Sequence, residues 1–159
     1  MGTLKVGALD FNDIGTVEVV RDAIAEMASR PDSYHALQFK SSYYFQVTDL
    51  QLPSEAGWYI ILDGTLPLYV GQANNLNARL NTSQGSTDNF GQSDRTSDPE
   101  RNFIKKFIEV GVIQTPRVCI IRSSELAAAV GTPESRLTNT DKGNIEKFIN
   151  LMRNGIAYM

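Results

Sequence analysis

The sequence is poor in the residues that most often bind metals or cross-link a chain. Its 159 residues include one cysteine, Cys119, and one histidine, His35. A single cysteine excludes an internal disulfide and a thiolate cluster for zinc. A single histidine excludes multi-histidine metal sites, and no nucleophile-elbow pattern accompanies it to suggest a Ser-His-Asp triad. Any bound metal must be held mainly by carboxylate, water and substrate, which favours a hard ion such as Mg²⁺ or Mn²⁺.

Long hydrophobic runs are also missing. No apolar stretch approaches the roughly 18 residues that cross a bilayer, and the N-terminus lacks the basic start and apolar stretch of a secretory signal. We therefore expect a cytoplasmic protein without membrane association. The apolar content of 42% and the charged content of 21% are ordinary for a globular protein, and the length suits one core.

A net positive charge is absent as well, because the chain carries a formal charge of −3. That balance is a poor match for a protein that grips DNA over its whole surface. The charges are unevenly spread, however. Residues 1–56 hold four Lys or Arg against eight Asp or Glu, a balance of −4, and residues 72–122 hold seven against five, a balance of +2. Nucleic-acid binding through the middle of the chain stays open.

Hydrophobic periodicity and turn signals predict an α+β fold, a small antiparallel β-sheet flanked by helices. Strands are expected at residues 43–47, 57–63, 67–71 and 116–122, and helices at 16–29, 75–81, 99–111, 124–130 and 140–153. The Asp63-Gly64 turn joins two of the strands into a hairpin, which makes that pair antiparallel. Residues 82–98 are polar and aperiodic, which predicts a long loop.

The most specific pattern comprises two tripeptides, a short helix and a distant carboxylate. Gly57-Trp58-Tyr59 is followed by Tyr69-Val70-Gly71, and then by Asn75-Leu76-Asn77-Ala78-Arg79. Glu146 lies on the last predicted helix. This combination resembles the GIY-YIG nuclease family, whose name records the two tripeptides on neighbouring strands. The resemblance covers about residues 57–154, which predicts a nuclease-like domain at 57–159 and an N-terminal extension at 1–56. The extension, a helix plus a strand, could complete the fold, mediate dimerisation or recognise a target sequence.

The resemblance implies a metal-dependent DNA endonuclease that hydrolyses phosphodiester bonds. Glu146 would bind one Mg²⁺ or Mn²⁺ ion at the scissile phosphate, and Arg79 would stabilise the same phosphate. Tyr59 is implied as the general base for the attacking water, with Tyr69 assisting, although the sequence leaves open which tyrosine accepts the proton. A phenol with its ordinary pKa near 10 is a poor base at neutral pH, so the metal and Arg79 must lower it.

The residues themselves are consistent with these roles. Tyr59 and Tyr69 lie on adjacent antiparallel strands joined by a short turn, so both phenols can face one cleft. Arg79 carries a fixed fork of donors suited to phosphate. A step of about 100° per residue places Glu146 at the edge of a buried stripe formed by Ile145, Phe148, Ile149 and Met152. Each residue also has a structural interpretation, as a packing aromatic, an exposed helix arginine or a surface glutamate.

The sequence departs from the family pattern at three places. Trp58 replaces a small aliphatic residue, which is a packing change. Gln72 stands where some members carry a lysine, so no lysine role can be carried over. Asn150 and Asn154 correspond only loosely to an asparagine near the end of many members.

Contacts to DNA are expected from Asn75, Arg95, Arg101 and Lys105, although the basic residues of this group fit a solvated helix face equally well. A restriction-like role usually requires a dimer, so a homodimer is among the partners to consider. Two other functions remain open: a catalytically inactive DNA-binding or interaction module that keeps the nuclease fold, and a structural domain with accidental motif matches. His35 receives no role, and Cys119 is expected in the core.

Overall fold

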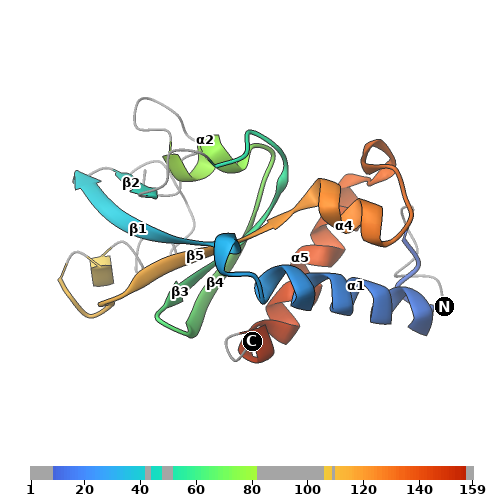
Figure 1. The fold of residues 1–159 in the computed structure, drawn as a ribbon, viewed down its shortest axis with the longest axis horizontal. Helices are drawn as coiled ribbons and strands as arrows, with labels where there is room; N and C mark the ends of the chain where they lie inside the picture. Colours follow the sequence, from blue (N-terminus) through green and yellow to red (C-terminus); the bar gives the residue numbers. More distant parts are fainter. Residues whose placement is uncertain (1–8, 42–43, 48–51, 82–105, 109, 157–159) are drawn as a thin grey trace.

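The computed structural model describes residues 9–41, 44–47, 52–81, 106–108 and 110–156 (Figure 1). The helical elements are α1 (Ile14–Ala28), η1 (Pro31–Ser33), α2 (Leu76–Asn81), α4 (Ser123–Ala129), η3 (Glu134–Arg136) and α5 (Asn139–Ile156). The strands are β1 (Tyr34–Ser41), β2 (Tyr44–Val47), β3 (Gly57–Asp63), β4 (Leu66–Ala73) and β5 (Pro116–Arg122). No helix within these described ranges is both long and apolar enough to cross a membrane.

The described strands form one sheet in the order β2-β1-β5-β3-β4. Each recorded strand pair is antiparallel. With helices packed beside this sheet, the predicted α+β class and its antiparallel sheet are confirmed. Strand β3 lies between β5 and β4, and its residues from Gly57 to Leu62 are all buried.

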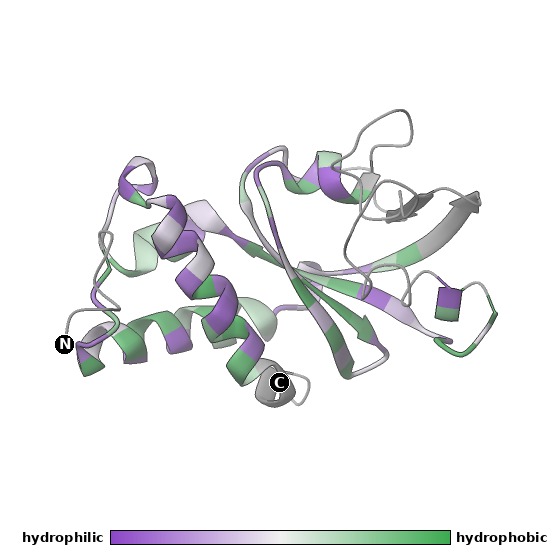
Figure 2. Ribbon diagram, turned by 180° about the vertical axis from the view of Figure 1, so that it is seen from behind, coloured by the Kyte–Doolittle hydropathy of each residue, from purple (hydrophilic) through white to green (hydrophobic). Residues whose placement is uncertain are grey.

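The sheet buries different side chains on its two faces because successive residues of a strand point in opposite directions. Trp58, Ile60 and Leu62 pack into a core with residues of α1, α4 and α5. Tyr59 and Ile61 pack into a second core, which includes Leu76 and Leu80 of α2. Figure 1 shows α1, α4 and α5 together at one end of the molecule and α2 at the other side of the sheet. Figure 2 shows hydrophobic residues along the central strands that separate these cores.

Helix α5 is fixed to the sheet and to the N-terminal segment by polar contacts in its first turn. Thr138 Oγ1 accepts a hydrogen bond from the Asp141 amide at 3.1 Å, and the Asp141 carboxylate accepts one from the Thr138 amide at 2.9 Å, a reciprocal capping arrangement. The same carboxylate accepts the Leu9 amide at 3.1 Å. The Trp58 indole donates to the Lys142 carbonyl at 3.1 Å. Trp58 therefore does more than fill the core, because it also ties α5 to β3.

The N-terminal segment contributes to the same sheet and core as the rest of the chain. Strand β1 pairs with β5, with Tyr34 opposite Cys119. Val20 and Ile24 of α1 are fully buried in the core under the sheet. Of the three roles left open for residues 1–56, the described part of the segment performs the first, completing the fold.

Most predicted elements are confirmed with small shifts at their ends. The strand at 116–122 and the first hairpin strand have the expected bounds, and Cys119 is buried as predicted. Helix α5 is longer than predicted, since it begins at Asn139 and runs to Ile156. Strand β1 was not predicted, because its sequence of Tyr34–Ser41 mixes polar and apolar residues and only the pairing with β2 and β5 stabilises it. The predicted loop at 82–98 and the start of the helix predicted at 99–111 lie outside the described residues.

Candidate active site

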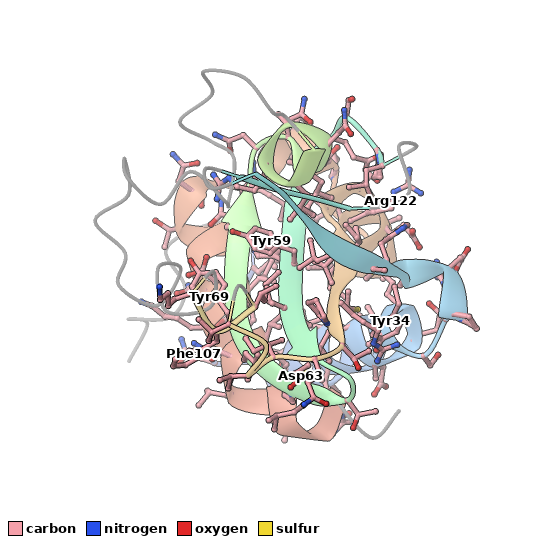
Figure 3. The ribbon with its side chains drawn as sticks, turned by 90° about the vertical axis from the view of Figure 1, so that its left-hand side faces the viewer. Tyr34, Tyr59, Asp63, Tyr69, Phe107 and Arg122 are labelled. Atoms are coloured by element: carbon pink, nitrogen blue, oxygen red, sulfur yellow. The ribbon has the colours of Figure 1, made fainter. Side chains whose placement is uncertain are left out.

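The β3–β4 hairpin brings the two motif tyrosines together on one face of the sheet. Tyr59 lies opposite Gly71, and Tyr69 lies opposite Ile61, so the tyrosines are diagonal neighbours across the pair. Their ring centroids are 6.2 Å apart with an angle of 32° between the rings. Figure 3 shows both side chains on the face of the sheet that the viewer sees, next to each other. This is the face of the second core, which also holds α2.

The two motif glycines are required by close approach. A Cβ atom on Gly71 would collide with the ring and hydroxyl of Tyr59, which lies across the glycine. A Cβ atom on Gly57 would collide with the Ile121 carbonyl and would come within 2.8 Å of Leu76 Cδ1. Glycine inside a strand often marks such an approach of another chain segment. The glycines therefore position the Tyr59 ring and let β5 and α2 approach the hairpin.

Helix α2 carries Arg79, and its first turn is capped by residues that precede β3. The Leu76 amide donates to the Glu55 carbonyl at 2.8 Å, and the Asn77 amide donates to the Pro53 carbonyl at 3.1 Å. Asn75 Oδ1 accepts the Ala78 amide at 3.0 Å, which makes Asn75 the cap of the helix. These bonds satisfy amides that a helix start leaves without intrahelical partners.

The Arg79 guanidinium reaches back from α2 to the hairpin. Arg79 Nη1 donates to the Tyr59 hydroxyl oxygen at 3.3 Å and to the Gln72 carbonyl at 3.1 Å. Arg79 Nε is buried and has no hydrogen-bond partner among the described residues. A buried donor without a partner costs free energy. Arg79 Nε could therefore form a favourable hydrogen bond with an additional acceptor.

Glu146 lies on α5, the helix that packs against β4. Its carboxylate is half-buried, and burial raises its pKa above the ordinary value, while the positive charges of Lys147 and Arg79 act in the opposite direction. The carboxylate is therefore only partly solvated, and the charges of Lys147 and Arg79 favour its ionised form.

The structure thus brings Tyr59, Tyr69 and Arg79 into one cluster, and it places Glu146 on a separate helix that packs against β4. Tyr59 is fully buried, and Tyr69 is 9% exposed. The side-chain oxygen of Asn75 caps α2. Arg95, Arg101 and Lys105, the other residues predicted to contact DNA, lie outside the described residues.

Sequence reasoning missed the residues that hold this cluster in place. Glu55 supports α2 through its carbonyl, and its carboxylate accepts hydrogen bonds from Arg122 at 2.8 Å and from Ser124 at 2.7 Å. Arg122 holds the pKa of Glu55 below its ordinary value. No motif marks Glu55 in the sequence, because its partners on β5 and α4 are distant along the chain.

The donor set available for a metal is small. Within the described residues, no three His, Cys, Asp or Glu side chains gather in a group that could hold an ion. Glu146 is the carboxylate predicted to bind the metal. Magnesium usually keeps several waters and binds one or two carboxylates together with substrate phosphates, so a single half-buried carboxylate fits this ion.

Comparisons with models of protein families, with curated proteins and with solved structures found no match.

Proposed function

We propose that this chain is a metal-dependent DNA endonuclease, restriction-like in its chemistry, that hydrolyses phosphodiester bonds. The proposal depends above all on one observation: Arg79 of α2 donates a hydrogen bond to the Tyr59 hydroxyl oxygen at 3.3 Å. A guanidinium, a phenol and a half-buried carboxylate can supply the charge stabilisation, proton transfer and metal binding that hydrolysis of a phosphodiester uses.

Arg79 would bind the scissile phosphate. Its Nη1 atom already has partners, but the buried Nε atom has none among the residues described here. Phosphate oxygens accept hydrogen bonds from arginine with good geometry and strong charge assistance. Because the negative charge of the phosphate grows as the water attacks, a fixed cation at this place stabilises the transition state more than the ground state.

Tyr59 would act as the general base, with Tyr69 packed beside it. A cationic donor hydrogen-bonded to the phenol oxygen favours the deprotonated form of that oxygen. Tyr59 is fully buried, so a water molecule can reach its oxygen only when the side chains above it move.

Glu146 would hold the Mg²⁺ or Mn²⁺ ion. When bound, the ion would neutralise negative charge on the phosphate and lower the barrier to attack. Glu146 contributes by presenting a partly desolvated carboxylate, whose electrostatic interactions are stronger than those of a fully hydrated group. Lys147, the next residue of α5, helps to keep this carboxylate ionised.

The test is nicking of supercoiled plasmid DNA by the purified protein in Mg²⁺ and in EDTA. We expect cleavage only with the metal, a loss of about 10²–10³-fold in Arg79→Lys and of about 10²–10⁴-fold in Tyr59→Phe, and no measurable cleavage by Glu146→Gln. Matched controls are Glu134→Gln and Arg136→Lys, exposed residues of η3 that should leave cleavage unchanged. Cleavage by Glu146→Gln at the wild-type rate would remove the carboxylate from the mechanism.

A second function is favoured by the complete burial of Tyr59 and by the bond from Arg79 to the Gln72 carbonyl. Both features are also expected in a catalytically inactive module that binds DNA or a protein and keeps the hairpin only as a scaffold. This alternative predicts binding of a DNA duplex without cleavage under any metal condition. It also predicts that Tyr59→Phe leaves duplex binding unchanged, which a titration by fluorescence anisotropy would measure.

A further inference from the structure

The outer surface of α1 and α4 is hollowed by two adjoining cavities of about 390 Å³ and 480 Å³. Val19 and Ala129 line both cavities, so the two form one groove, called here the α1–α4 groove. It belongs to the helices that cover the face of the sheet opposite the Tyr59 cluster (Figure 1). A ligand in this groove would therefore not compete with a ligand at the candidate active site.

Aliphatic side chains line the middle of the groove. Val19 is 41% exposed, and Ala23, Ala129 and Val130 line the same hollows. A single exposed valine on a surface needs no explanation. Here, however, the valine stands at the junction of two cavities among other aliphatic groups, where an apolar side chain from a partner could be buried.

The charged residues that line the groove are predominantly acidic. They comprise Asp10, Asp13, Asp22, Glu26 and Glu125 against Arg30, a balance of −4. Arg30 is already paired, since it donates to Glu125 at 2.7 Å and to Glu26 on the other side. Two arginines outside the lining also pair with its carboxylates, Arg21 with Asp22 at 3.1 Å and Arg122 with Glu125 at 3.7 Å, and they change the balance to −2.

This combination selects the kind of ligand. The acidic lining repels phosphate groups, so it disfavours a nucleic acid. It attracts Lys and Arg, and complementary charges raise the association rate and fix the orientation of a partner. The lining residues within α1 run from Gly15 to Met27, which at 1.5 Å per residue is a length of about 18 Å. That length accommodates about three turns of an amphipathic helix lying in a groove.

We propose that the α1–α4 groove binds an amphipathic helix of a partner protein, in which an aliphatic stripe is flanked by Lys and Arg. The stripe contacts Val19, Ala129 and their aliphatic neighbours, and the basic residues on both sides of it meet the carboxylates of Asp22 and Glu26 at one end and Asp13 at the other. The proposal is independent of the DNA endonuclease activity proposed above.

The test uses a synthetic helical peptide of about 18 residues, with leucine at every third or fourth position and lysine elsewhere, labelled with fluorescein. Anisotropy titrations with wild-type protein should give saturable binding that weakens as salt is added. The same peptide with glutamate in place of lysine should not bind. Val19→Lys and Asp22→Lys should each weaken binding at least tenfold.

Leu66→Lys is the matched control for Val19→Lys. Leu66 is an exposed aliphatic residue, 59% exposed, on β4, which does not line the groove. This variant should bind the peptide as the wild type does. Equal weakening by Leu66→Lys and Val19→Lys would mean that only net charge attracts the peptide, and unchanged binding by Val19→Lys would place the peptide elsewhere; either result overturns the proposal.

Sedimentation velocity distinguishes a partner helix from a second copy of this chain. We expect the same sedimentation behaviour for the wild type and Val19→Lys. A dimer that Val19→Lys converts to a monomer would show that the groove is covered by another copy, and would also overturn the proposal. Circular dichroism of the variants checks that these exposed substitutions leave the fold intact.

Discussion

The two faces of strand β3 differ in how they treat polar groups. On the face toward α1, α4 and α5, the packed residues are apolar, the Trp58 indole has an acceptor, and the Asp141 carboxylate receives several donors. The uncharged Ser123 hydroxyl at the start of α4 is buried without a partner among the described residues. On the opposite face, a buried Arg79 Nε lacks a partner among the described residues. Glu146, which α5 carries, has a pKa raised by burial.

If the proposed function is right, this difference separates a face that only stabilises the protein from a face that also binds a ligand. Unsatisfied buried donors and partly desolvated carboxylates reduce stability. Groups of this kind concentrate at functional sites. A single strand, β3, serves both faces because its side chains alternate, and adjacent residues such as Ile60 and Ile61 therefore belong to different cores.

The largest expected effects come from Ile60→Ala and Ile61→Ala, which compare the two faces at adjacent, fully buried positions. Both should lower the free energy of unfolding by about 2–5 kcal/mol, because each leaves a cavity, as urea denaturation would measure. Only Ile61→Ala, opposite Tyr69, should also reduce plasmid cleavage under conditions where the variant is folded. Equal cleavage by the two folded variants would contradict the separation of the faces.

Gly71→Ala should have the next largest effect. The added methyl group collides with the Tyr59 ring, and overpacking of this kind costs about 1–3 kcal/mol. Gly143→Ala on α5 is the control, because a Cβ there meets nothing within 4 Å. It should raise stability by about 0.5–1 kcal/mol, since alanine favours a helix over glycine. The melting temperatures of the two variants measure this difference. A melting temperature of Gly71→Ala equal to or above that of Gly143→Ala would refute the steric role of Gly71.

Ser123→Ala tests the meaning of an unpaired polar atom away from the cluster. Ser123, at the start of α4, is 1% exposed, and its Oγ atom has no hydrogen-bond partner among the described residues. Removing the hydroxyl should raise the free energy of unfolding by about 1 kcal/mol and leave DNA cleavage unchanged. Chemical denaturation measures the first effect. Reduced cleavage would mean that Ser123, like Arg79, serves a ligand and not only the fold.

The smallest expected effect concerns the pH dependence of Glu146→Gln. Because burial raises the pKa of Glu146 in the folded protein, the folded state binds this proton more tightly than the unfolded chain. The wild type therefore loses stability as the pH rises above the ordinary pKa of a glutamate. The glutamine of Glu146→Gln stays neutral at every pH and avoids the cost of burying a charge. The variant should therefore be slightly more stable than the wild type at pH 7, where Glu146 is ionised, and not at pH 3.5.

Urea denaturation at the two pH values measures this difference. Glu134→Gln, an exposed control on η3, should show the same small difference from the wild type at both pH values. A gain in stability for Glu146→Gln that is equally large at pH 3.5 would show that the glutamine packs better for reasons unrelated to ionisation.

Periodicity alone was sufficient to predict α1, the β3–β4 hairpin, β5, α4 and α5, because each has an apolar pattern of one clear period or a strong turn signal. Strand β1 escaped prediction, since its strand conformation depends on pairing with β2 and β5. Of the four residues predicted for one site, Tyr59 and Tyr69 lie side by side and Arg79 donates to Tyr59, while the meeting of Glu146 with these three stays a prediction. Their chemical roles stay predictions until cleavage is measured.

Local sequence determined the hairpin, the side of each strand residue and the placement of the two tyrosines, because turn chemistry and the two-residue repeat of a strand act over a few residues. Tertiary structure alone decided how α2 is capped by Pro53 and Glu55, which groups of the hairpin Arg79 contacts, and that α1 and α4 border a common groove. Those relationships join segments far apart in the chain, and they depend on which faces become buried together when the sheet forms.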